Sequence, residues 1–166
     1  MVSFVISKKN IIIAIFMLVA VLTRLVPHLP NFTPVTAIAL FGGLYISNRI
    51  LAYALPLVIM LISDLFVGFS SITLFVYAAF LIVTSIGMLR KKPSIFTIFL
   101  GSLSFFIVTN FGVWILGYPK TWTGLAECYT LALPFFRNSL WGDFFYSGIM
   151  IVGFNFVQKQ YLQKVK

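Results

Sequence analysis

The sequence predicts an all-α integral membrane protein, folded as one bundle of six transmembrane helices. The 166 residues are 61% hydrophobic and 9% charged, whereas soluble domains are about 45–50% apolar and about 25% charged. The cations stand between long apolar runs, where signals for membrane topology belong. The net charge of +9 therefore does not predict a nucleic-acid partner. The length suits a single domain over residues 1–166.

A straight helix needs about 20 residues to cross the hydrocarbon layer of a bilayer, which is roughly 30 Å thick. The predicted spans cover residues 5–24, 33–48, 50–68, 71–89, 94–114 and 139–158. The first span resembles the start of a signal peptide, because Lys8 and Lys9 precede an apolar run. No small-x-small cleavage site follows, so we expect a retained helix.

The second predicted span is the shortest, so we expect it to be tilted or irregular. Protein should cover it, because lipid cannot hydrogen-bond an exposed backbone. Only a couple of residues separate it from the third span, which follows Arg49, so these two should form a tight hairpin. The fourth span ends at the cations of 90–92, the fifth opens after Pro93, and the sixth ends before Lys159.

The cations predict the orientation of the bundle. With the N-terminus inside, the inner segments hold Lys8, Lys9, Arg49, Arg90, Lys91, Lys92, Lys159, Lys164 and Lys166. The outer segments hold Arg24, Lys120 and Arg137. Because cytoplasmic loops carry an excess of lysine and arginine, both termini are expected on the cytoplasmic side.

A long outer connection over residues 115–138 is expected between the fifth and sixth spans. Connections beyond about 12–15 residues often carry function or contain structure of their own. We expect a short interfacial helix over 124–133, ended by Pro134, that acts as a lid on the outer face.

This topology places most of the chemically distinctive side chains in the outer third of the bundle. The three acids of the chain are Asp64, Glu127 and Asp143. A charge near the middle of a membrane helix costs about 2.5–3.5 kcal/mol on insertion scales, so such residues usually face a bundle interior or a water-filled cavity. We expect a substrate pocket open to the outside, formed by Arg24, His28, Asn31, Asp64, Asn110, Arg137, Asp143 and Tyr146. The alternative is that Arg24 with Asp64, and Arg137 with Asp143, are structural ion pairs.

Residue spacing predicts the walls and the roof of this pocket. One face of the sixth span would present Asp143, Tyr146, Ser147 and Met150. On the fifth span, Ser102, Thr109 and Val113 share a stripe, with Asn110 beside it. The three prolines of the connection after the first span restrict its backbone, so it can hold Arg24, His28 and Asn31 rigidly over the pocket.

Common catalytic and metal-binding motifs are missing from the sequence. It has no phosphate loop of the G-x-x-x-x-G-K-[ST] type, no H-E-x-x-H and no Ser-His-Asp arrangement of a known context. One cysteine, Cys128, and one histidine, His28, do not make a metal site. We therefore expect no enzymatic activity, no catalytic residue, no bound metal and no cofactor.

Four stretches carry a resemblance to a known family: "RLVPHLPNFTPVTAIALFGG", "PLVIMLISDLFVG", "TNFGVW" and "ALPFFRNSLWGDFFYS". Over roughly residues 11–155 the chain resembles a family of uncharacterised bacterial membrane proteins labelled as transport proteins. That family is similar to the substrate-binding S components of energy-coupling factor (ECF) transporters. The resemblance implies six helices, cytoplasmic termini, a pocket near the outer face and a place in the bacterial cytoplasmic (inner) membrane.

The resemblance also implies the ligand and the partners. S components bind a vitamin or a metal ion and deliver it beside a coupling subunit driven by two ATPases, so a small, vitamin-like polar solute and such an ECF-type coupling subunit are expected, besides membrane lipid. Many S components dock through Ala-x-x-x-Ala in the first helix, whereas Ala14 and Ala20 are six residues apart here. A solitary or differently coupled transporter therefore stays an alternative.

Two other classes of protein stay open at this point. The polar cluster of a non-transporting membrane subunit would dock a protein partner, and a stable partner purified without a ligand would favour that class. A membrane enzyme would use His28 with Asp64 or Asp143, and turnover that disappears in His28→Ala would favour that one.

Overall fold

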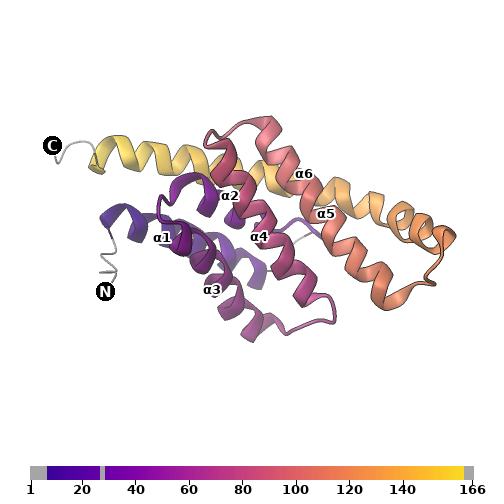
Figure 1. Ribbon diagram of the computed structural model, residues 1–166. Helices are drawn as coiled ribbons and strands as arrows, with labels where there is room; N and C mark the ends of the chain where they lie inside the picture. Colours follow the sequence, from indigo (N-terminus) through magenta and orange to yellow (C-terminus); the bar gives the residue numbers. More distant parts are fainter. Residues whose placement is uncertain (1–6, 27–28, 163–166) are drawn as a thin grey trace.

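The computed structural model describes residues 7–26 and 29–162, and in this part of the chain all regular structure is helical. The α-helices are α1 (Lys8–Leu22), α2 (Val35–Tyr45), α3 (Arg49–Val67), α4 (Thr73–Arg90), α5 (Ile95–Gly117) and α6 (Trp122–Val157). A 3₁₀ turn, Thr23–Leu25, extends α1, and a π-helical turn, Gln158–Leu162, extends α6. Figure 1 shows the helices gathered in one bundle, with α6 running from one end of the molecule to the other.

Four of the described helices, α3, α4, α5 and α6, are long and apolar enough to cross a membrane. Their outward faces carry large apolar side chains such as Phe66 and Leu74, each 76% exposed. Soluble monomers rarely leave large contiguous apolar patches open to water, so these faces fit contact with lipid. The helical membrane class is the coarse prediction that the structure supports. With 15 and 11 residues, α1 and α2 are shorter than a straight crossing requires.

The short helix α2 lies at the centre of the bundle and contacts each of the other five α-helices. Every residue from 35 to 43 is buried. Its closest approach is to α4, where the backbones at Gly43 and Gly87 are in direct contact. The surrounding helices thus cover the backbone of α2, which is the condition under which a membrane tolerates a helix too short to cross it.

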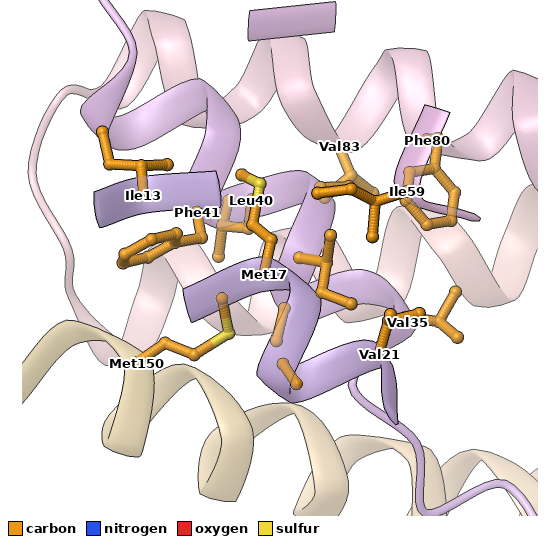
Figure 2. Close-up of a cluster of buried hydrophobic side chains, with 14 of the residues drawn as sticks. Ile13, Met17, Val21, Val35, Leu40, Phe41, Ile59, Phe80, Val83 and Met150 are labelled. Carbon is orange, nitrogen blue, oxygen red and sulfur yellow. The ribbon is translucent and has the colours of Figure 1, made fainter. Parts of the chain in front are cut away.

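The apolar core forms around α2. Figure 2 shows Ile13 and Met17 of α1 gathered with Leu40 and Phe41 of α2 and with Met150 of α6, and all five side chains are buried. In a membrane these contacts are not driven by removal from water, because lipid tails are as apolar as leucine. Close packing of side chains stabilises them instead.

The expected long loop over 115–138 is wrong, because α5 ends at Gly117 and α6 begins at Trp122. Lys120 explains how so short a turn closes: its Nζ donates to the carbonyl oxygens of Trp114 at 3.0 Å and Tyr118 at 2.6 Å, near the end of α5. Thr121 then caps α6, since its hydroxyl accepts from the backbone N–H of Gly124 at 3.1 Å.

The predicted lid is also wrong, since residues 124–133 belong to the first half of α6 and Pro134 lies inside that helix. Membrane helices tolerate an interior proline, because local adjustments re-satisfy the one carbonyl group that the proline leaves without a donor. Side chains also hold this half against α5: the Tyr129 hydroxyl donates to the Ile107 carbonyl oxygen at 2.7 Å. The sixth helix therefore has 36 residues, a length of about 54 Å, instead of the predicted span 139–158.

Candidate functional site

A cavity of about 580 Å³ lies among α3, α4, α5 and α6, beside the first turn of α2. The connections around residues 31–33 and 68–72 complete its wall. Its polar lining residues are Arg24, Asn31, Thr33, Thr36, Asp64, Ser70, Thr73, Ser102, Thr109, Asn110, Ser139 and Asp143. Sites for small ligands commonly measure about 300–1,000 Å³ and combine apolar walls with a few placed polar groups, so this cavity has the size and the character of such a site.

One wall of the cavity holds an ion pair. Arg24 Nη1 lies 2.8 Å from Asp64 Oδ1, and the two side chains are only 15% and 7% exposed. The same nitrogen donates to Ser63 Oγ at 2.9 Å. The Tyr77 hydroxyl donates to the other carboxylate oxygen, Asp64 Oδ2, at 2.8 Å. Asp64 is therefore both neutralised and hydrogen-bonded by protein groups.

Asp143 stands elsewhere in the lining, in a different environment. It is 2% exposed, and Ser102 Oγ donates to its Oδ2 at 2.7 Å. Thr36, in the first turn of α2, is its second polar neighbour. Within residues 7–26 and 29–162 no cation pairs with this carboxyl group. The two buried acids of the cavity thus differ: Asp64 has a positive partner, and Asp143 has hydroxyl groups.

Asn31 lies at the exposed rim of the cavity, in a left-handed backbone conformation with φ of 61°. Asparagine adopts this conformation more readily than most residues. Asn138 of α6 holds the segment, since its Nδ2 donates to the Pro30 carbonyl oxygen at 3.2 Å. The backbone at Phe32 also lies close to Gly142, where an added Cβ would come within 3.2 Å of the Phe32 Cα. Contacts with α6 therefore fix this part of the rim.

Asn110 lines the cavity from α5. Its Nδ2 donates to the Phe106 carbonyl oxygen of its own helix at 2.8 Å. No hydrogen bond from the described residues reaches its side-chain oxygen. This oxygen is therefore an acceptor available to a bound molecule.

Five of the eight predicted binding residues line this one cavity: Arg24, Asn31, Asp64, Asn110 and Asp143. His28 lies outside the described residues. Whether the five bind a substrate stays a prediction. The Arg24–Asp64 ion pair, weighed above as an alternative, is present.

Arg137 and Tyr146 do not line the cavity, although they are on the same helix as Asp143. Arg137 is six residues before Asp143, which places it about 240° around the helix axis, and it is exposed, so the proposed Arg137–Asp143 pair does not form. The Tyr146 ring packs instead on Phe32, with 5.7 Å between ring centroids.

Sequence reasoning missed Tyr77 and the aromatic part of the lining. Tyr77 lies within the predicted fourth span, where nothing marks its hydroxyl as a partner of Asp64. Phe105 and Phe106 of α5 and Phe136 of α6 form an apolar wall. Phe136 falls in the expected loop, so a helical wall was not predicted there. The doublets "FF" at 105–106 and 135–136 are the only available signal.

A second, larger cavity of about 1000 Å³ lies at the other end of α2. It is lined by the last turn of α2, by Tyr53 of α3 and by the cations Lys9, Arg49 and Lys91. No acid is among its lining residues. The two cavities therefore meet opposite ends of the same short helix.

The fold and the cavity define a class: a helical protein of membrane type with a partly open, ligand-sized cavity. No group of three or more histidine, cysteine, aspartate or glutamate side chains that could hold a metal occurs in the part of the chain described. The chain belongs to a family of unknown function, DUF6580, whose model matches residues 5–165. No curated protein and no solved structure matches it.

Proposed function

We propose that this protein is a membrane transport protein that binds a small polar solute from the outer side in the 580 Å³ cavity. The cavity is the observation that carries the proposal, because it combines ligand-like volume, apolar walls and buried charge. Polar groups inside a membrane protein commonly mark a pathway for a substrate or an ion.

The proposed orientation has six membrane-crossing segments and both termini in the cytoplasm. The α3–α4 connection and the α5–α6 turn then lie outside, and the α3–α4 connection forms the cavity wall on that side. The basic cavity at the end of α2 lies inside, in agreement with the excess of cations expected there. Although α1 and α2 are short, the longer helices around them complete the bundle.

The resemblance to S components supports a role in uptake together with an ECF-type coupling subunit and its ATPases. The sequence has no phosphate loop of its own, so energy from ATP would have to come from such a partner. In this proposal the protein supplies recognition of the solute, and the partner supplies the driving force.

Two adjacent positions on α6 allow a direct test. Ala132 lines the cavity, whereas Leu133 is 55% exposed on another face of the helix. Tryptophan at position 132 should fill the cavity, and tryptophan at position 133 should extend toward lipid. Native mass spectrometry of protein extracted gently from its membrane should find a bound small molecule in the wild type and in Leu133→Trp but not in Ala132→Trp.

Retention of the small molecule by Ala132→Trp would contradict the proposed site. Wild-type protein that carries a stoichiometric protein partner, and no solute, would contradict the proposed function and favour a docking subunit. Folding of each variant is checked by its elution as a single species in size-exclusion chromatography.

A further inference from the structure

We propose that Asp143 selects a positively charged group, so that the solute is an organic cation, such as a protonated amine carried on an apolar or aromatic body. This inference rests on the proposed function and names the class of its substrate. It follows from the different environments of the two carboxyl groups in one cavity.

Among the residues that the structure describes, Asp143 is the buried acid of the cavity that has no counter-charge. Its neighbours Ser102 and Thr36 supply hydroxyl groups, which hydrogen-bond a carboxylate but do not neutralise it. A buried charge without a partner is costly in a protein interior. A cationic ligand in the cavity would supply the missing partner.

The other charges among the described lining residues do not compensate Asp143. Arg24 is engaged by Asp64 and Ser63, and Asp64 takes a further hydrogen bond from Tyr77. With one cation and two acids among the described lining residues, the fully ionised cavity has a net charge of −1. The field in the cavity therefore favours a positive ligand over a negative one.

The first turn of α2 provides part of the compensation for Asp143 but not all of it. Thr36 belongs to that turn, and Pro34 at the N-cap makes no side-chain capping bond. The N-terminus of a helix is equivalent to about half a positive charge. This partial charge is smaller than a full counter-charge, which the described residues do not supply to Asp143.

The apolar side of the cavity suits the remainder of such a molecule. Phe105, Phe106 and Phe136 line it, and the rings of Phe106 and Phe136 lie 4.5 Å apart between centroids. Aromatic faces attract cations and stack with flat apolar groups. A cation with an aromatic body would thus satisfy both the carboxylate and this wall.

The inference can be tested with three probes that differ in charge but little in shape: 2-phenylethylammonium, 2-phenylethanol and 3-phenylpropanoate. Binding to purified protein is measured by isothermal titration calorimetry in wild type, Asp143→Asn and Glu127→Gln. Glu127 is the matched control, because it is an exposed acid on the same helix, outside the cavity lining. The wild type and Glu127→Gln should bind the ammonium at least about tenfold more tightly than the alcohol. In Asp143→Asn this preference should vanish.

Equal binding of the three probes by the wild type, or a charge preference that survives in Asp143→Asn, would overturn the inference and leave the proposed function standing. Failure of all three probes to bind the wild type would overturn the inference and count against a ligand site in this cavity. A purely structural Asp143 would lower the melting temperature in Asp143→Asn without changing the order of the three affinities.

Discussion

Arg24 and Asp64 show how one ion pair can join two segments inside the protein. Arg24 follows shortly after α1, and Asp64 lies in the last turn of α3. Their contact therefore connects the C-terminal ends of these two helices. Exposed ion pairs contribute about 0–1 kcal/mol. In buried pairs, removal of one partner costs about 3–5 kcal/mol, because the other charge remains buried and uncompensated. The low exposure of both side chains places this pair near the buried case.

A double-mutant cycle should reveal this coupling. We expect Arg24→Leu to lower the free energy of unfolding by about 3 kcal/mol, measured by denaturant titration in detergent micelles. Arg24→Leu combined with Asp64→Leu should recover much of that loss, because neither charge is then left alone. Arg137→Leu is the control, since Arg137 is exposed and has no ion pair within the described residues; its effect should stay within about 0.5 kcal/mol. Additive effects of the two substitutions would contradict the coupling.

At the scale of residues, the sequence predicted which part of the bundle holds the few charged and polar side chains. It did not always predict which face of its helix each of them occupies. Asp64 and Asp143 were predicted to face the interior because a lone acid in an apolar helix has few other places to go. Tyr146 and Arg137 were misplaced, because an apolar helix has no polar face that fixes its rotation. Tyr77 was missed because its partner, Asp64, lies on another helix, and the sequence does not show which side chains of two helices meet.

Among the helices, α2 and α4 approach each other so closely that backbone meets backbone. A Cβ added at Gly87 would lie 2.7 Å from the Leu40 carbonyl oxygen, and one at Gly43 would overlap the Thr84 carbonyl oxygen. Thr84 Oγ1 also donates to the Ala39 carbonyl oxygen at 3.2 Å. Because the opposing atoms are backbone atoms, they cannot turn aside as a flexible side chain would.

Gly43→Ala should therefore destabilise the bundle by about 1–3 kcal/mol, the usual cost of overpacking a core. Gly148→Ala is the control, since an added Cβ there meets no atom within 4 Å. It should leave stability unchanged or raise it by up to about 1 kcal/mol, because alanine favours a helix over glycine. Thermal unfolding in detergent compares the two variants, and an unchanged melting temperature for Gly43→Ala would show that the helices separate easily.

The elements were partly predictable from the sequence. The short second span was expected to need cover by protein, and the buried helix α2 agrees with that expectation. The start of α6 was not predictable, because "GYPKTWTG" reads as the beginning of a loop. Whether Lys120 caps the carbonyl groups of α5 depends on a side-chain geometry that residue order does not determine.

For the whole molecule, the proposed orientation makes a prediction about the two ends of α4. Ser71 lies in the turn before α4 and Lys92 in the turn after it, and both are exposed. In a Cys128→Ser background, Ser71→Cys should react with a membrane-impermeant maleimide in intact cells. Lys92→Cys should react only after the membrane is opened, and the reverse pattern would show the opposite orientation.

The position of α2 between the two cavities has an electrical consequence. Eleven helical residues extend about 16 Å, roughly half the thickness of the hydrocarbon layer. Where aqueous cavities enter a bilayer from both sides, the membrane voltage falls mainly across the low-dielectric segment that remains between them. One elementary charge carried across the full voltage changes energy by about 2.3 kcal/mol per 100 mV. In the proposed orientation, a cation leaving Asp143 for the inner cavity would gain most of that energy over the length of α2, and this gain would act against the repulsion by Lys9, Arg49 and Lys91. Its release would therefore be sensitive to the resting potential of the cell.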